Sequence, residues 1–352
     1  MSSRPFIAAR IERTINRRVE GLLRRLGWHD AIISHTGYGS SQRLRVLGRI
    51  VLCPPGRMDA ASRRDEAWLE RRGWRNLVAL SAVSRPAVVR IGSRAVHVTS
   101  DRDGYIDVTV DRHGLGPGWR QITIETDDCP ATGARVLILS DQVRFGLISD
   151  IDDTILSTHL PRLLVAAWNY LVLTESARLP VPGMARMYRD ILRQRPGTPV
   201  FYVSTGSWNT LPFLERFMLR HGYPAGPMLL SDWGPTNTGW FRSGRQHKTK
   251  ALRSLARDFP DISWLLIGDD GQFDPVIYAD FARQFPDQVT AVAIRELNPV
   301  QQVLAHGSWR ERWRDGARPP ATAPEVRGPD GASLQPGLQA CLPPPRPRGG
   351  SD

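Results

Sequence analysis

Acidic side chains crowd the end of one apolar run, and their spacing defines the chemistry that the chain could perform. Residues 145–149 predict a buried strand, and Asp150, Asp152 and Asp153 follow directly. Ionised carboxylates gathered in an apolar setting are costly unless a cation neutralises them. The alternating Asp150 and Asp152 offer the hard oxygen ligands that Mg²⁺ prefers. We therefore expect a metal site here, although a solvated turn after a strand would give the same pattern.

A second strand-like run ends in small and hydroxyl-bearing residues. Residues 199–203 are apolar, and Ser204, Thr205 and Gly206 follow them. Hydroxyl groups and backbone amides before a helix can bind phosphate oxygens. Ser204 alone could equally be an ordinary helix cap, so its interpretation depends on the other segments.

A lysine and a second acidic strand end complete the pattern. Lys248 is predicted near the start of a helix over about 247–258, where it could neutralise phosphate and carboxylates, with Lys250 as the alternative. The apolar run 263–267 leads to Asp269, Asp270 and Asp274, each of which is a possible metal ligand. Asp274 is expected to start a helix, because Pro275 suits a first helical position.

The elements that must position these residues alternate between strand and helix. Strands are expected at 145–149, 199–203, 228–230, 263–267 and 289–294, with helical segments between them. This alternation predicts an α/β domain with a doubly wound, mainly parallel sheet over residues 145–306. Ligands of such sheets bind at the carboxyl ends of the strands, where all four segments would lie.

The preceding and following segments have different patterns. Residues 1–29 predict a basic amphipathic helix, suited to packing on its own protein or to an anionic membrane. Residues 30–144 predict a small β-sandwich-like domain, with strands at 44–52, 88–98, 105–110, 120–126 and 135–139 and a helical interruption at about 59–82. Residues 307–352 are rich in Pro and Arg and predict a disordered basic tail.

Composition restricts the partners and the compartment. The 352 residues carry a formal net charge of +12, which favours anionic partners. The three cysteines are widely spaced, which disfavours a disulfide framework or a zinc site. The sequence shows neither an apolar signal segment nor a run long enough to cross a bilayer. We therefore expect a cytoplasmic protein that can associate peripherally with a membrane.

The four segments, in this order, resemble those of the haloacid dehalogenase superfamily of phosphotransferases. The match is closer to the catalytic domain of the actin-patch phosphatidate phosphatase family. It is carried by residues 149–154 (SDIDDT), 182–184 (PGM), His247-Lys248, Gly268-Asp269, Asp274-Pro275 and Tyr278. The β-rich part also looks similar, so the resemblance covers residues 30–300. Ser204-Thr205-Gly206-Ser207-Trp208 departs from the expected Ser-Asn-Ser-Pro-Trp, and Asp270 stands where Ser is usual.

The resemblance implies a role for each candidate residue. Asp150 would be the nucleophile that forms an aspartyl-phosphate, and Asp152 the general acid and then base. Lys248 would bind phosphoryl oxygens and screen the aspartates. Substrate-side contacts would come from Thr154, Ser204, Thr205 and Gly206, and the Mg²⁺ ligands from Asp150, Asp152, Asp269 and Asp274.

The resemblance also implies a phosphorylated lipid substrate, with phosphatidate leading. The intervals between the four segments have little room for a large lid domain, and an open site suits a lipid headgroup at an anionic membrane surface. Alternative substrates are a nucleic-acid end, a phosphoprotein or a soluble phosphate ester. Nucleic acid is disfavoured because no compact basic-aromatic motif is present. A non-catalytic lipid- or protein-binding module is the remaining alternative.

Overall fold

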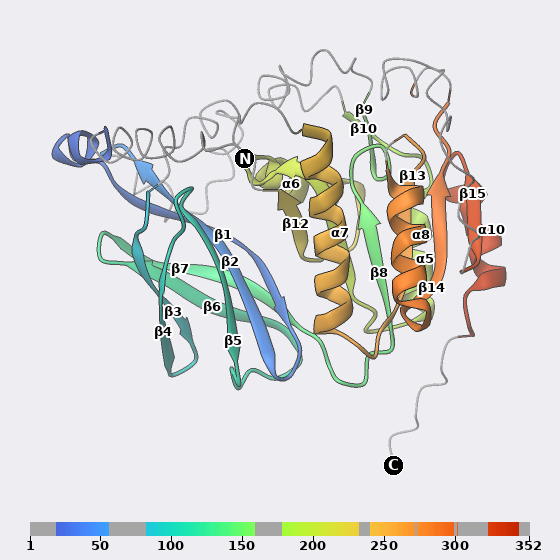
Figure 1. Ribbon diagram of the computed structural model, residues 1–352, viewed down its shortest axis with the longest axis horizontal. Helices are drawn as coiled ribbons and strands as arrows, with labels where there is room; N and C mark the ends of the chain where they lie inside the picture. The colour runs from blue at the N-terminus through green and yellow to red at the C-terminus, as the bar shows by residue number, and fades with distance from the viewer. Residues whose placement is uncertain are drawn as a thin grey trace, which may run out of the picture. The chain divides into compact units, whose positions relative to one another are not determined.

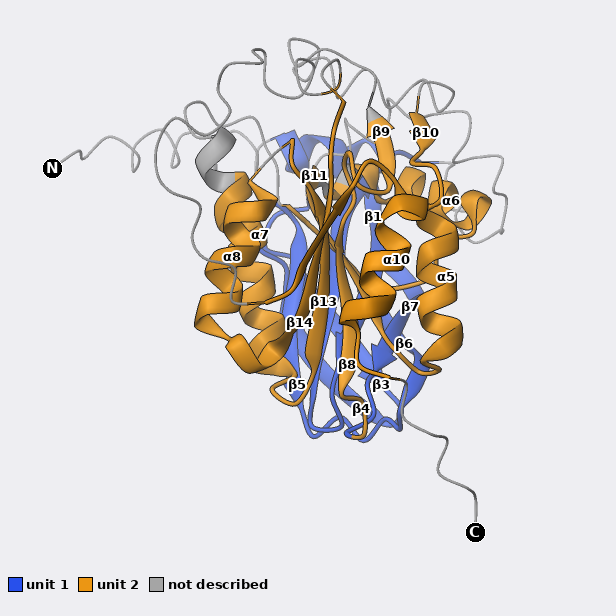
Figure 2. Cartoon of the chain, turned by 90° about the vertical axis from the view of Figure 1, so that its right-hand side faces the viewer, with its two compact units in different colours: residues 1–141 blue, residues 142–352 orange. Residues whose placement is uncertain are grey.

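A computed structural model describes residues 19–55, 82–158, 178–231, 240–271, 273–298, 301 and 323–344. The chain divides into two compact units, residues 1–141 and 142–352, coloured separately in Figure 2. The predicted helical interruption, and the N-terminal residues before position 19, lie outside the described residues. Residues 19–25 are helical, and Leu23 and Trp28 pack against the core of their own unit.

The first unit is built on one seven-stranded sheet with the strand order β4-β3-β6-β7-β1-β2-β5. Its strands are β1 (His29–Gly39), β2 (Arg43–Cys53), β3 (Pro86–Ile91), β4 (Arg94–Thr99), β5 (Tyr105–Asp111), β6 (Gly118–Thr126) and β7 (Cys129–Ile138). Neighbouring strands pair antiparallel except β1 and β7. Inward-facing Leu, Ile and Val side chains of alternating positions form the core.

This sheet curls, and the predicted sandwich is not confirmed. The Arg94 guanidinium of edge strand β4 donates a hydrogen bond of 2.7 Å to the Asp111 carbonyl of the opposite edge strand β5. The predicted single strand 88–98 is two strands, because Gly92 with φ of 59° turns the chain back on itself. Strand β1 was not predicted from the sequence.

The second unit is a six-stranded sheet, β12-β11-β8-β13-β14-β15, in which all neighbouring strands are parallel. The strands are β8 (Phe145–Asp150), β11 (Val200–Ser207), β12 (Met228–Ser231), β13 (Ser263–Asp269), β14 (Val289–Arg295) and β15 (Glu325–Gly328). All five strands predicted for this region are present, so the expected mixed α/β unit with a parallel sheet is confirmed. Strands β9 (Leu156–Thr158) and β10 (Arg178–Pro180) follow β8 in the chain and form a short antiparallel pair (Figure 1).

Helices cover both faces of this sheet (Figure 2). They are α5 (Met184–Gln194), α6 (Leu211–His221), α7 (Trp240–Asp258), α8 (Asp274–Gln284) and α10 (Gly331–Cys341), with the short helices η4 (Trp208–Thr210) and η5 (Pro286–Gln288). Helices α7 and α8 share one face, and α5, α6 and α10 the other. In the described ranges, no helix is long and apolar enough to cross a membrane.

The prediction that residues 307–352 are disordered is wrong for residues 325–341. Strand β15 pairs with β14, and the Asp330 carboxylate caps α10 by accepting from the Ser333 amide at 2.8 Å. Leu334 and Leu338, spaced four apart, are buried. The Pro-rich average composition obscured this short amphipathic helix.

The sheet reverses its winding at β8. The chain runs from β8 outward through β11 and β12 and then returns to β13 on the other side of β8. The carboxyl ends of β8 and β13 therefore lie at the switch point, where open α/β sheets bind their ligands. Asp150 is the last residue of β8 and Asp269 the last of β13, so the topology brings two sequence-distant aspartates together.

Candidate active site

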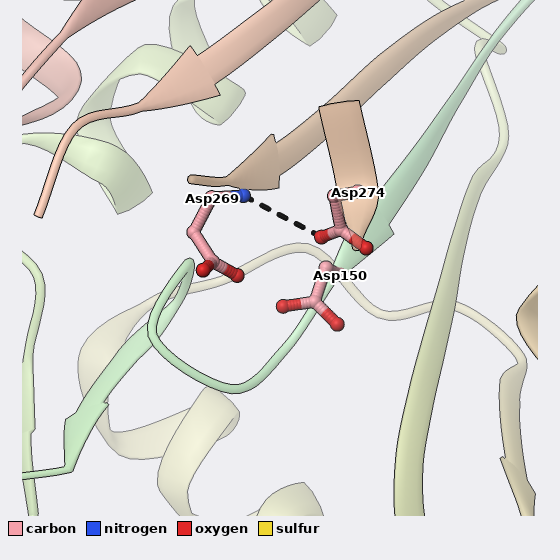
Figure 3. Close-up of side chains that lie close together, drawn as sticks. All are labelled: Asp150, Asp269 and Asp274. Carbon is pink, nitrogen blue, oxygen red and sulfur yellow. Dashed lines mark hydrogen bonds between the residues drawn. The ribbon is translucent and has the colours of Figure 1, made fainter. Parts of the chain in front are cut away.

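Three buried carboxylates meet at the carboxyl edge of the parallel sheet (Figure 3). Asp150, Asp269 and Asp274 each place an oxygen within 4.8 Å of the others, and they are at most 1% exposed. Asp150 and Asp269 end neighbouring strands, and Asp274 begins α8. The structure thus joins three of the four predicted metal ligands, while Asp152 does not belong to this group.

Glycine and backbone amides allow this close approach. A Cβ atom at Gly268 would lie 2.5 Å from Oδ2 of Asp274, so only glycine lets α8 start this close to β13. The Asp269 carboxylate accepts a 2.6 Å hydrogen bond from the Gly271 amide. The Tyr278 hydroxyl donates to the Ile267 carbonyl at 3.0 Å and ties α8 to β13. These contacts fix both acidic side chains.

Lys248 supplies positive charge to the cluster. Its Nζ lies 2.6 Å from Oδ1 of Asp150 and 2.6 Å from Oδ1 of Asp274. Helix α7 starts at Trp240 rather than at residue 247, so Lys248 sits in its middle and not at its start. Lys248 points inward and is buried, whereas Lys250 is exposed, so the structure favours Lys248 over the alternative lysine.

The electrostatic balance of this cluster is incomplete. Burial raises the pKa of Asp150 to about 8, with Asp274 and Asp152 adding to the rise and the nearby Lys248 opposing it. Burial also raises the pKa of Asp269 well above its usual range, reinforced by Asp274 and Asp150. Burial lowers the pKa of Lys248, but Asp150 and Asp274 more than reverse this, and the net shift is upward. One ammonium therefore faces three carboxylates.

The residues present fit a hard divalent cation. The donors are all carboxylate oxygens, the ligand chemistry of Mg²⁺. A dication near Asp150, Asp269 and Asp274 would offset the negative charge that Lys248 leaves uncompensated. These three residues, rather than Asp152, are those that would hold it.

Asp152 lies beside the cluster and faces the hydroxyl-bearing segment. Its Oδ2 accepts a 2.7 Å hydrogen bond from the Ser204 hydroxyl, and the Gly206 amide donates to Ser204 Oγ at 2.8 Å. Ser204 lies within β11, which continues to Ser207, and not at a helix start. The half-buried Asp152 is thus aimed toward the segment that the sequence assigns to phosphate binding.

The other predicted substrate-side residues differ in what they contact. The buried Thr154 hydroxyl lies 3.1 Å from Oδ2 of Asp150 and 3.5 Å from Oδ2 of Asp269, so it links both strand ends. The Thr205 carbonyl accepts from the Ser231 hydroxyl at 2.7 Å, which gives this residue a structural contact. Asp270 accepts from the Leu297 amide at 2.9 Å and lies outside the three-carboxylate group.

Arg295 is a positioning residue that the sequence did not reveal. Asp153 adopts a left-handed conformation with φ of 57°, which is strained for a residue other than glycine. The buried Arg295 guanidinium donates to its carbonyl at 2.6 Å and to Gln301 Oε1 at 3.1 Å. Because Asp153 follows Asp152, Arg295 holds the acidic loop in shape. Its position at the end of β14, next to β13, was the available signal.

Arg178 is a second residue without a prediction from the sequence. It is 5% exposed in β10, and its guanidinium lies over the Phe213 ring, 4.7 Å from the ring centroid. Burial lowers its pKa, while Asp152 and Asp153 oppose the shift by their charge. It adds positive potential on the Asp152 side of the site.

The geometry defines a parallel α/β unit with a buried carboxylate–lysine centre at its switch point. Residues 145–296 match the family described as phosphatidate phosphatase APP1, catalytic domain. This segment is therefore similar in sequence to that catalytic domain.

Two relatives match this chain over stretches of similar length. Phosphatidate phosphatase APP1 of Saccharomyces cerevisiae is 29% identical over 163 residues, which are 46% of this chain and 27% of that protein. An uncharacterised protein of Schizosaccharomyces pombe, C29B5.04c, is 25% identical over 158 residues, 45% of this chain and 26% of its own. The match therefore spans about a quarter of these relatives' length.

Similarity to solved structures is weak. A carbohydrate acetylesterase from Xanthomonas citri, XAC1771, aligns over 79% of this chain and 73% of its own, with 10% identity and a TM-score of 0.27. That level of similarity supports no conclusion about fold or function.

Proposed function

We propose that the protein is a Mg²⁺-dependent phosphatase, with a haloacid dehalogenase-like catalytic domain, that hydrolyses phosphatidate to diacylglycerol and phosphate through an aspartyl-phosphate. The observation that carries this proposal is the meeting of Asp150, Asp269, Asp274 and Lys248 inside the segment that matches a phosphatidate phosphatase catalytic domain. We also propose that the protein acts in the cytoplasm, at the surface of a membrane.

In the first step, a carboxylate oxygen of Asp150 attacks phosphorus in line with the leaving group. The new bond joins that oxygen to phosphorus, and the bond from phosphorus to the diacylglycerol oxygen breaks. Asp152 gives its proton to the departing oxygen. The Ser204 hydroxyl, 2.7 Å from Oδ2 of Asp152, holds this carboxyl group in place.

In the second step, Asp152 takes a proton from water, and the water oxygen attacks phosphorus. The bond between phosphorus and Asp150 breaks, which frees phosphate and restores the carboxylate. Lys248 forms ion pairs with Asp150 and Asp274, which keeps both carboxylates in place, and its charge attracts the phosphoryl oxygens. A bound Mg²⁺ would supply Lewis-acid stabilisation of the phosphoryl charge. Thr154 keeps the Asp150 carboxylate oriented.

The proposal is tested by phosphate release from a panel that contains phosphatidate, a 5′-phosphorylated oligonucleotide, a phosphopeptide and a small soluble phosphomonoester. We expect hydrolysis that requires added Mg²⁺, with the highest kcat/KM for phosphatidate, and its loss in Asp150→Asn. A higher kcat/KM for another ester would show that phosphatidate is not the preferred substrate. Equal rates with Mg²⁺ and with chelator would show that hydrolysis does not require the metal. Lack of hydrolysis of every ester by a folded protein would favour the non-catalytic alternative.

A further inference from the structure

A basic groove lies between helices α7 and α8, outside the carboxylate cluster. Its volume is about 850 Å³, and its lining includes Arg245, Lys250, Arg253, Arg257, Phe273 and Asp280. Both helices lie on the same face of the sheet (Figure 2). None of these six residues takes part in the catalytic steps proposed above.

The groove has an excess of positive charge that folding does not explain. Lys250, Arg253 and Arg257 follow one another at spacings of three and four along α7, so like charges are neighbours on one helix face, which destabilises a helix. Among the residues that the structure describes, none of the three forms an ion pair with a carboxylate; Arg253 donates to the Gln284 side chain at 3.0 Å and Arg257 to the Arg253 carbonyl at 3.1 Å.

The acidic side chain in the groove is already engaged. Asp280 pairs with Arg245 at 3.4 Å and with Arg283 on its own helix. It therefore cannot neutralise the stripe formed by Lys250, Arg253 and Arg257. A net positive, solvent-exposed groove of this kind is complementary to an array of phosphate groups.

The groove is joined to the candidate active site by the same two helices. Lys248 on the inward side of α7 contacts the carboxylates, while Lys250, two residues on, is exposed. Phe273 is 41% exposed and directly precedes Asp274. An exposed aromatic ring beside basic side chains suits the headgroup region of a bilayer.

We propose that the α7–α8 groove is the docking face for an anionic phospholipid surface. Lys250, Arg253 and Arg257 contact headgroup phosphates, and Phe273 enters the interfacial layer next to Asp274. This inference extends the proposed function, because it says how an enzyme acting on an anionic lipid would hold its active site at the membrane. A lipid surface is favoured over nucleic acid because the matched catalytic family acts on a lipid, as its description states.

The test is vesicle co-sedimentation of the full chain, with the double variant Arg253→Glu/Arg257→Glu. The matched control is Arg186→Glu/Arg220→Glu, which makes the same charge change at exposed positions of α5 and α6, on the opposite face. Vesicles of phosphatidylcholine alone are compared with vesicles that also contain phosphatidate. Thermal unfolding of each variant verifies that it is folded.

We expect the groove variant to bind phosphatidate vesicles at least tenfold more weakly than the control variant, since each basic side chain near such a surface contributes roughly fivefold to affinity. Equal binding by the two variants would overturn the inference. The inference would also be overturned if the groove variant lost binding to a single-stranded oligonucleotide but still bound the phosphatidate vesicles. The vesicle assay does not depend on turnover. A folded protein that binds through the groove but releases no phosphate from any ester in the separate hydrolysis assay would therefore count against the proposed function alone.

Discussion

The Lys248 ammonium lies 2.6 Å from Oδ1 of Asp150, so a side chain from the middle of α7 and the last residue of β8 meet as a buried ion pair. The pair exists because β8 ends at the switch point of the sheet and α7 packs over β11 and β12. A charged Lys248 would not tolerate burial at this depth without an opposite charge, and its ammonium opposes the rise that burial causes in the pKa of Asp150.

Replacing Lys248 by Met keeps an unbranched side chain that is one atom shorter and removes its charge. We expect the metal-free protein to lose about 3–5 kcal/mol in free energy of unfolding, because buried carboxylates are left uncompensated. Activity should fall by about 10²-fold or more. Urea unfolding in chelator and phosphate release give the two values. Arg220→Met removes an exposed charge from α6 and should change neither; a Lys248 variant equally stable and active would refute the assignment.

The effect of Asp152 on the rate of leaving-group release should be larger for a leaving group that needs a proton. Asp152→Asn should slow hydrolysis of an alkyl phosphate by about 10²–10⁴-fold, the usual contribution of a general acid. In the first turnover, the loss in the rate of leaving-group release should be much smaller for p-nitrophenyl phosphate, whose phenolate leaves without protonation. Hydrolysis of the shared aspartyl-phosphate should be slowed to the same extent with both substrates. Asp270→Asn is the matched control, because Asn still accepts from the Leu297 amide. Equal losses in first-turnover release of the two leaving groups would exclude a general-acid role.

Arg295 should support the loop rather than the chemistry directly. Arg295→Met leaves the Asp153 carbonyl and the Gln301 side chain without this donor, at a cost of about 1–3 kcal/mol in free energy of unfolding. Arg327→Met on the neighbouring strand removes a half-exposed ion pair and should cost less than about 1 kcal/mol. If the two variants unfold at the same urea concentration, the loop does not depend on Arg295.

The dependence of the free energy of unfolding on pH should arise partly from Asp150 and should change when Mg²⁺ binds. Its pKa is raised to about 8 in the metal-free native state. Between pH of about 4, the ordinary pKa of a carboxyl, and about 8 the native state holds a proton that the unfolded state has released, so stability falls as pH rises. Mg²⁺ should remove this dependence by favouring the ionised carboxylate.

The measurement is urea unfolding in chelator at several pH values, for the wild-type protein and Asp150→Asn. The wild type should lose stability relative to the variant as pH rises through this window, and added Mg²⁺ should narrow the difference. A stability difference between wild type and variant that is independent of pH would show that Asp150 is ionised in the metal-free native state.

Sequence patterns identified most of the residues that meet at the edge of the parallel sheet and all five strands predicted for that unit, but other features were missed. Apolar runs that end in aspartates identified β8 and β13, because strand burial and strand polarity are local properties. Lys248 could be recognised, but not its place in the middle of α7, since the start of that helix has no strong signal. The role of Arg295 depends on a carbonyl far away in the chain, which no local pattern encodes. The curl of the first sheet depends on the pairing of distant strands, and β15 with α10 was hidden by a Pro-rich composition.

The proposed mechanism depends on covalent phosphorylation of Asp150. Acid quenching during turnover of radiolabelled phosphatidate, followed by peptide mapping, tests it most directly. We predict a hydroxylamine-sensitive label on the peptide that contains Asp150, and its absence in Asp150→Asn. A label on another residue, or an Asp150→Asn variant that still turns over phosphatidate at the wild-type rate, would contradict the account.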